Sequence, residues 1–381
     1  MRRTVNRVVL AVATGIAGLT VSPTVASAAV SCGASISTHT TLTTDLNCPG
    51  TAIFVNAPNV ILDLGGHTIS GVQQPDGQPG TNGVQVSFNR TGVIIRNGTI
   101  RGFNRGVGIN QGANDALVTR LTLDANALGI GIFGNPTSVS GARLVSNTIT
   151  NTTRFSGIQM TGTGHRVEAN TITNGASTGI AFNGDDHVVQ ANTITDAGQS
   201  GITLAAFPNS PGPFHRNQIL TNKVVRQARV GSQATGINVN FGNDTVVTGN
   251  TVDGRSTANG LFVFDSTNTQ VARNQIKNGN AGINVGGVSS GTHLLSNTLT
   301  ANRGGVFVGS GTTGNVLERN LASASQFDGI NVTSPSSVLT GNVAYNNGSL
   351  GIRAVNGVTD GGGNRAFGNA LGQCSPSISC T

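Results

Sequence analysis

One short run of residues recurs along this chain at a nearly fixed interval, and this repeat constrains the fold more than any other feature. The run Asn-Thr-Ile-Thr begins at Asn147, at Asn170 and at Asn192, so its copies lie 23 and 22 residues apart. A fixed period of roughly 20–50 residues indicates a repeat protein, in which one structural unit stacks on the next.

A second phrase extends the pattern over most of the chain: glycine, then Ile, Val or Leu, then any residue, then an apolar residue. Counting a variant that begins at Ala52, the phrase occurs thirteen times. The twelve glycines are Gly83, Gly106, Gly129, Gly157, Gly179, Gly201, Gly236, Gly260, Gly282, Gly305, Gly329 and Gly351.

Two further strand signals lie between these phrases, because an apolar residue stands three positions before the repeated Asn and another two positions after it. Each repeat therefore predicts three short strands separated by turns, and no segment has a helical period. We expect an all-β fold, a right-handed parallel β-helix of about 13 coils of 22–24 residues with three short strands per coil. A leucine-rich repeat has a similar period but requires Leu at most core sites and a helical segment, so it ranks second.

The repeated asparagine has a mechanical explanation. In stacked coils, equivalent turn asparagines hydrogen-bond along the rod and to the local backbone. We interpret them as a structural ladder rather than as a binding site. They are Asn147, Asn170, Asn192, Asn222, Asn250, Asn274, Asn297, Asn320 and Asn342.

Residues 1–28 have the pattern of a secretory signal peptide. Arg2 and Arg3 precede an apolar run over residues 8–21, and Ala26-Ser27-Ala28 fits a cleavage site. The apolar run is too short for a membrane-spanning helix, so we expect a secreted, extracellular protein without a membrane span. Cleavage removes three arginines and lowers the formal net charge from +7 to +4. The general and the twin-arginine secretion routes both stay open.

The four cysteines form two close pairs near the ends of the chain, Cys32 with Cys48 and Cys374 with Cys380. An exported chain meets an oxidising space, so we predict one disulfide in each pair.

A solenoid must cover the strand edges at its two ends. We expect an N-terminal cap over residues 29–50, with a single strand over residues 40–46, and a C-terminal cap over residues 371–381. The β-helix itself would span residues 51–370.

From about residue 40 to residue 370 the chain resembles bacterial secreted proteins of the pectate-lyase-like superfamily. The resemblance rests on the repeats and on two runs near the start, Asp45-Leu-Asn-Cys48 and Val60-Ile-Leu-Asp63-Leu-Gly-Gly-His67-Thr-Ile69. It implies the β-helix fold, in which we interpret Asp63 and His67 as structural. Members include polysaccharide lyases, glycoside hydrolases and uronate epimerases, so the fold alone does not give the reaction.

In that superfamily substrates lie along one strand face, which makes the outward residues of the glycine-containing strand candidates for substrate binding. Amide and phenyl side chains share this face, and both suit a sugar chain. The candidates are Asn183, Asn238, Asn240, Phe262 and Phe264. A polar sheet face in water explains the amides as well, and the chain has no Trp and one Tyr.

The longest interval between glycine phrases, from Gly201 to Gly236, indicates an insertion, and long insertions often carry function. Carboxylates, imidazoles and a guanidinium near it suit general acid–base chemistry. The catalytic candidates are Asp185, Asp186, His187, His215 and Arg216. They do not match the motifs of characterised members residue by residue, and a solvated turn is the alternative.

Two expectations about this region follow from the spacing. His165 and His187 each stand two residues before an equivalent Val, so their rings should stack about 5 Å apart on neighbouring coils. A positive local field should surround the insertion and favour an acidic ligand. The cations concerned are Arg216, Lys223, Arg226 and Arg229.

These features predict a secreted protein that binds or processes an extracellular polysaccharide, with an acidic polymer as the favoured ligand. A non-catalytic surface or matrix scaffold is the alternative. If the protein is an enzyme, it is a polysaccharide lyase, a uronate epimerase or a glycoside hydrolase. No cofactor motif is evident, and a divalent metal such as calcium stays open. We expect a monomer with no nucleic-acid partner.

Overall fold

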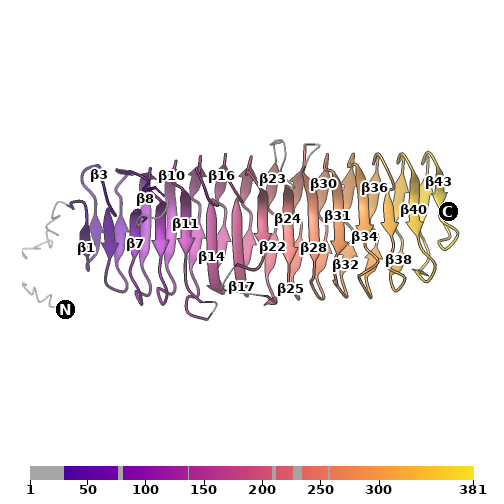
Figure 1. Cartoon of the computed structure of the whole chain (residues 1–381), viewed down its shortest axis with the longest axis horizontal. Helices are drawn as coiled ribbons and strands as arrows, with labels where there is room; N and C mark the ends of the chain where they lie inside the picture. The colour runs from indigo at the N-terminus through magenta and orange to yellow at the C-terminus, as the bar shows by residue number, and fades with distance from the viewer. Residues whose placement is uncertain (1–29, 76–79, 136, 208–211, 226–233, 256–257) are drawn as a thin grey trace, which may run out of the picture.

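The protein is a rod of stacked coils (Figure 1), seen in a computed structural model that describes residues 30–75, 80–135, 137–207, 212–225, 234–255 and 258–381. Strands of successive coils pair in parallel, and all named elements of these residues are strands. This confirms the predicted all-β parallel solenoid. No described helix is long and apolar enough to cross a membrane. The predicted signal peptide lies outside the described residues.

Sheet A is the first of three faces of the rod and has 15 strands. With neighbouring strands about 4.8 Å apart, the rod is about 70 Å long. The strands of sheet A are β1 (Ala34–Ile36), β4 (Ile53–Val55), β7 (Asn82–Val86), β9 (Arg105–Ile109), β11 (Leu128–Ile132), β14 (Ile158–Thr163), β17 (Ile180–Asp185), β20 (Ser200–Leu204), β24 (Thr235–Asn240), β28 (Asn259–Phe264), β31 (Ala281–Gly286), β34 (Gly304–Val308), β37 (Ile330–Val332), β40 (Leu350–Ala354) and β43 (Gly372–Cys374).

The other two faces, B and C, follow sheet A in each coil, and β8 (Ile94–Arg101) and β10 (Leu117–Asp124) bend around the corner and belong to both. Face B also contains β2 (Thr40–Thr41), β5 (Ile61–Asp63), β12 (Arg143–Val145), β15 (Arg166–Glu168), β18 (Val188–Gln190), β22 (Gln218–Leu220), β26 (Val246–Thr248), β29 (Gln270–Ala272), β32 (His293–Leu295), β35 (Val316–Glu318), β38 (Val338–Thr340) and β41 (Thr359–Asp360). Face C also contains β3 (Leu46–Cys48), β6 (Thr68–Gly71), β13 (Thr148–Thr150), β16 (Thr171–Thr173), β19 (Thr193–Thr195), β23 (Lys223–Val225), β27 (Thr251–Asp253), β30 (Gln275–Lys277), β33 (Thr298–Thr300), β36 (Leu321–Ser323), β39 (Val343–Tyr345) and β42 (Arg365–Phe367).

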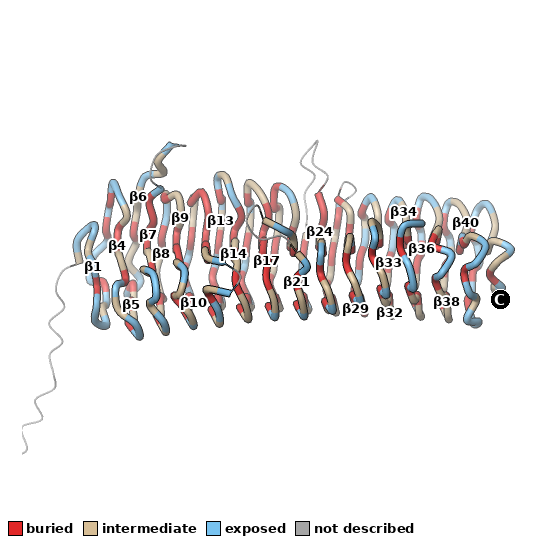
Figure 2. The backbone as a smooth tube through the Cα atoms, turned by 60° about the horizontal axis from the view of Figure 1, so that its bottom comes forward, coloured by how far each residue is buried: buried red, intermediate tan, exposed pale blue. Residues whose placement is uncertain are grey.

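Apolar side chains at alternate strand positions fill the inside of each coil, and the exposed segments gather at the turns (Figure 2). In the coil of β17, Ile180, Phe182, Val189 and Ile194 are completely buried, as the alternation predicts. Burying each such side chain stabilises the fold by roughly 1.5–3 kcal/mol.

The repeated asparagines form the predicted ladder at the corner between faces B and C. The backbone N–H of Asn147 and its side-chain Nδ2 both donate to Oδ1 of Asn170, at 2.9 and 3.0 Å. Nδ2 of Asn147 also donates to the carbonyl of Val118, at 2.9 Å. The same contacts continue from coil to coil as far as Asn364, one rung beyond the predicted set.

The N-terminal segment differs from the single covering strand that we predicted. Its described part contains β1, β2 and β3, one strand for each face, so it is a first coil in its own right. The predicted strand over residues 40–46 is wrong, because the chain turns between Thr41 and Leu46 to enter face C. Cys32 and Cys48 are bonded within this coil. Asp63 ends β5, in the coil that follows, and pairs with Arg96.

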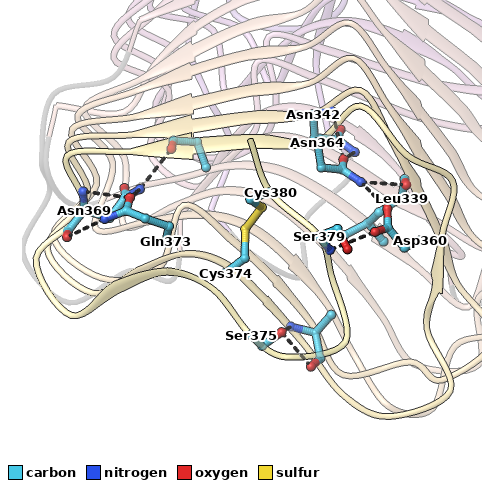
Figure 3. The surroundings of a disulfide bond; sticks show 12 residues. Leu339, Asn342, Asp360, Asn364, Asn369, Gln373, Cys374, Ser375, Ser379 and Cys380 are labelled. Atoms are coloured by element: carbon cyan, nitrogen blue, oxygen red, sulfur yellow. Dashed lines mark hydrogen bonds between the residues drawn. A yellow bond between two sulfur atoms is a disulfide. The ribbon is translucent and has the colours of Figure 1, made fainter.

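The C-terminal segment adds β43 and a tail that folds against the last coil, where Cys374 is bonded to Cys380 (Figure 3). The final ladder residue, Asn364, has no further asparagine to bond, and its Nδ2 donates instead to Asp360, at 2.9 Å. The backbone N–H of Ser379 donates to the other oxygen of that carboxylate, at 2.8 Å. The cap therefore closes the ladder and fixes the tail with one side chain.

The inward and outward positions of a coil should respond differently to the same charge. Ile180→Asp places a carboxylate in the apolar interior and should lower the free energy of unfolding by more than about 3 kcal/mol. Gln159→Asp, on the outer face of sheet A, should have little effect. Thermal and denaturant unfolding followed by circular dichroism compares the two, and equal destabilisation would contradict the orientation of the strands.

Both disulfides should be present in the protein recovered from the oxidising side of the membrane. Peptide mapping without reduction should return the links Cys32–Cys48 and Cys374–Cys380. Free thiols at these positions, or a link between the two ends, would show that the caps are wrongly described.

Candidate functional site

Four of the five catalytic candidates meet at the corner between sheet A and face B. Asp185 ends β17, and its Oδ1 accepts the backbone N–H of His215 in β21 (Phe214–His215) at 2.7 Å. Arg216 follows and donates from Nε and Nη2 to the two oxygens of Asp186, both at 2.7 Å. β21 pairs with β25 (Gly242–Asn243), labelled at the lower edge of the rod in Figure 1, which holds the returning insertion against the next coil.

Carboxylates accompany the guanidinium of Arg216 at this corner. The hydrogen bonds from Arg216 hold the pKa of the Asp186 carboxyl below its usual range, and Asp186, Asp185 and Asp244 raise the pKa of Arg216. Three carboxylates therefore surround one guanidinium. A carboxylate paired twice with Arg is a poor proton acceptor. The positive field around the insertion stays a prediction, since two of the cations that it invokes lie outside the described residues.

Of the other cations of the prediction, the structure describes Lys223 alone. Lys223 begins β23 on face C, where it pairs in register with Thr193 and Thr251. Arg226 and Arg229 lie outside the described residues.

His187 is inside the coil and not at the surface corner, which corrects its placement in the candidate group. Its ring is completely buried and stacks on His165 with centroids 5.0 Å apart, as the spacing predicted. Nδ1 of His165 accepts the N–H of Ala142 at 3.0 Å, and Nδ1 of His187 accepts the N–H of His165 at 3.1 Å. The N–H of His187 donates in turn to Oδ1 of Asn217 at 3.0 Å. The two histidines are thus rungs of a second polar ladder.

These contacts hold both rings neutral. Because each Nδ1 accepts a hydrogen bond, the ring proton lies on Nε2, which faces the carbonyl of Thr161 or Asn183. Burial lowers the pKa of His165 to about 4, and burial together with His165 lowers the pKa of His187 to about 3. A protonated Nδ1 would lose its acceptor role and leave a buried N–H without a partner.

The substrate-binding candidates of β24 and β28 lie side by side on the outer face of sheet A. Asn238 pairs in register with Phe262, and Asn240 with Phe264. The Phe264 ring is 44% exposed, and a Cβ on Gly286 would be 3.2 Å from two of its atoms. The glycine on the neighbouring coil thus leaves room for the ring.

The row that begins with Asn238 and Phe262 continues toward the C-terminus, with amide and phenyl side chains alternating from coil to coil. We call it the amide–phenyl row, and its members are Asn238, Phe262, Asn284, Phe307 and Asn331. Phe307 is 38% exposed. Like side chains along the row are two coils, or about 10 Å, apart.

Asn183 is the exception among the substrate-binding candidates. It stands at an outward position of β17, but the residue is completely buried where β21 packs against that strand. Neither atom of its side-chain amide has a hydrogen-bond partner. The prediction that it lies open on the face is wrong, because the insertion changes the surface there.

Sequence reasoning missed a second group on sheet A. The guanidinium of Arg105 lies 4.6 Å from the ring centroid of Phe133. The signal for it was available, since two consecutive copies of the glycine phrase carry Gly108 and Gly131 at the outward position where other copies carry a side chain. No three His, Cys, Asp or Glu side chains of the described residues gather closely enough to hold a metal ion.

The sequence matches the family model described as the right handed beta helix region, over residues 105–276 and 156–322. These ranges together cover more than half of the chain. The chain therefore belongs to the right-handed β-helix family, as predicted. A search of curated proteins finds no match.

Solved structures of several β-helices are similar to this one. The A-module of Azotobacter vinelandii mannuronan C-5 epimerase AlgE4 is 13% identical, with 90% of this chain and 91% of that chain covered and a TM-score of 0.50. A tailspike protein mutant of E. coli bacteriophage HK620, in complex with pentasaccharide, is 13% identical, with coverage of 90% and 73% and a TM-score of 0.58. The Streptococcus pneumoniae surface protein and adhesin PfbA is 11% identical, with coverage of 89% and 91% and a TM-score of 0.53. At these identities the likeness shows the fold alone.

The buried histidines predict acid sensitivity of the fold. An unfolded His titrates near pH 6.5, whereas the folded pKa values are about 4 for His165 and about 3 for His187. Between these values the unfolded chain binds more protons, so stability is complete above about pH 6.5 and falls as the pH drops toward 4. The loss is on the order of 3 kcal/mol for each ring.

The variant His187→Asn tests this, since Asn217 occupies the equivalent position one coil later and an amide oxygen accepts the same N–H without titrating. Melting temperatures between pH 7 and pH 4 should fall less steeply for this variant than for the wild type. Ile172→Val, which changes the buried interior without removing a titrating group, serves as the control and should keep the wild-type slope. Identical slopes for all three proteins would exclude the buried pair as the cause.

Proposed function

We propose that this protein is an exported, non-catalytic β-helix that binds a polysaccharide along the outer face of sheet A. The observation that carries the proposal is the amide–phenyl row, in which five consecutive coils present alternating amide and phenyl side chains in register. The two disulfides support export, because such bonds persist in oxidising spaces.

The chemistry of the row suits a linear sugar chain laid along the rod. Amides donate and accept hydrogen bonds with hydroxyl groups, and phenyl rings cover the apolar C–H faces of pyranoses. Because the row repeats with the coil spacing, a polymer that lies along it meets the same contacts several times, and such repeated contacts add to affinity.

The similar structures support a carbohydrate ligand without supplying a reaction. Two of them are named as an epimerase of mannuronan and as a tailspike in complex with pentasaccharide. In the present chain Asp186 is neutralised by Arg216, and His187 is a rung inside the coil. These contacts favour binding over turnover.

Removing the two rings of the row tests the proposal. The variant Phe262→Ala/Phe307→Ala should bind at least about tenfold more weakly, since each lost ring contact is worth roughly 1 kcal/mol. Affinity electrophoresis in gels containing polygalacturonate, alginate or a neutral β-glucan measures the change. Phe367→Ala is the matched control, because this exposed ring lies on face C against Tyr345.

Wild-type retardation by at least one polymer, lost in the double variant and kept in the control, is the expected pattern. Equal retardation of all three proteins would contradict the proposed face. Unsaturated products or new reducing ends after incubation of the wild type with these polymers would overturn the non-catalytic part of the proposal.

A further inference from the structure

The N-terminal half of sheet A carries a feature that the amide–phenyl row does not include. Gly108 of β9 and Gly131 of β11 pair in register, between Gln85 of β7 and Gln159 of β14. A Cβ on Gly131 would be 2.3 Å from Cε2 of Phe133. The absence of a side chain there lets the Phe133 ring lie against the sheet.

Arg105 lies on that ring. Its guanidinium carbon is 4.6 Å from the Phe133 centroid, and its Cδ passes 3.8 Å from the place of a Cβ on Gly108. Burial lowers the pKa of the Arg105 guanidinium, but arginine stays charged in proteins. We call Arg105, Phe133, Gly108 and Gly131 the arginine platform.

The charge on this platform has no counterion within the described chain. Arg216 pairs with Asp186 and Arg353 with Asp328, each through short hydrogen bonds, whereas no described carboxylate or carbonyl accepts from the guanidinium of Arg105. A half-buried cation without a partner costs stability. Its five N–H groups remain available to a ligand.

Two amides beside the platform also have unused hydrogen-bonding groups. Asn82 pairs in register with Arg105, is 4% exposed, and has an Oδ1 without a partner. Asn110 follows Ile109, whose carbonyl accepts the backbone N–H of Phe133. The Nδ2 of Asn110 is buried and has no hydrogen-bond partner in the described chain. Both atoms are shielded from solvent, so the ligand contact of the platform rests on Arg105.

We propose that the arginine platform binds an ionised carboxylate of an acidic saccharide and that Arg105 selects such sugars over neutral ones. The inference rests on the proposed function, because it assigns a charge preference to the same sheet. A guanidinium stacked on a ring keeps its edge free, and that edge matches a carboxylate with two parallel hydrogen bonds. Since Phe133 fixes the plane in advance, little side-chain freedom is lost on binding.

The platform and the amide–phenyl row are separate contacts on one face. The strands β14, β17 and β20 lie between β11 and β24, and this stretch includes the covered Asn183. Changes in one contact are therefore measurable without loss of the other.

Calorimetric titration with oligogalacturonate and oligomannuronate, each compared with its methyl ester, tests the selection. The ester keeps the sugar ring and removes the charge. The wild type should prefer the acids by at least tenfold, less so as the salt concentration rises. Arg105→Gln should abolish the preference, so that acid and ester bind with equal affinity. Arg105→Lys should restore only part of it, because the charge returns without the planar edge.

Arg120→Gln is the matched control, since Arg120 is exposed at another corner, where its Nε donates to Asn97 at 2.8 Å, and it should keep the wild-type preference. Equal loss of the preference for acids in this control would show that the overall positive charge of the protein, and not Arg105, causes the preference. An unchanged preference in Arg105→Gln would also overturn the assignment of Arg105. Esters and acids bound equally by the wild type would overturn the platform alone. No binding of any saccharide would overturn the proposed function as well.

Discussion

The rod depends on buried amides that hydrogen-bond from one coil to the next. A coil that turns sharply leaves backbone N–H and C=O groups without strand partners, and each such buried group costs roughly 1–3 kcal/mol. One asparagine side chain can satisfy a backbone N–H with its Oδ1 and a backbone C=O with its Nδ2. Oδ1 of Asn250 accepts from the backbone and Nδ2 of Asn222, while its own Nδ2 donates to the carbonyl of Ile219 at 2.8 Å. The repeat of the sequence is therefore a consequence of the hydrogen bonds that each corner requires.

A ladder of this kind must end somewhere, and the ends explain residues outside the repeat. Asn347 and Asn369 stack at another corner, where Nδ2 of Asn347 donates to Oδ1 of Asn369 at 2.8 Å. This pair ends on Gln373, whose Oε1 accepts from Nδ2 of Asn369 at 2.8 Å, and the main ladder ends on Asp360 (Figure 3). The disulfide between Cys374 and Cys380 lies between these two terminal acceptors. It holds the tail where it covers the last coil. The cap therefore both shields the end of the rod and supplies hydrogen-bond acceptors to the terminal asparagines.

The sequence sufficed for the fold because both of its causes are periodic. Alternating apolar residues, and an asparagine every 22 to 24 positions apart from two longer intervals, are visible without any structure. Even the stacking of His165 on His187 followed from their equal offsets. The candidate site was harder to predict, because its properties depend on what lies outside the repeat. Burial of Asn183 depends on the insertion, and the charge at the corner depends on Asp244 from the next coil. Proximity of Asp186, His215 and Arg216 was predictable, but the pairing of Asp186 with Arg216 through two hydrogen bonds was not.

Binding groups can arise where the sequence departs from the repeat. Residues that keep to the repeat, at inward and corner positions, are used in packing and in hydrogen bonds between neighbouring coils. One departure is satisfied internally: Asp185 and Asp186 bond His215 and Arg216, which return the longest insertion to the rod. Such a group needs no ligand to explain it. The other departure, glycine at two successive outward positions, supports a cation that the described chain leaves unpaired. The corner of Asp185 and Asp186 has its hydrogen bonds satisfied within the protein, whereas the guanidinium of Arg105 has no acceptor among the described residues. The arginine platform is therefore the better candidate for ligand binding.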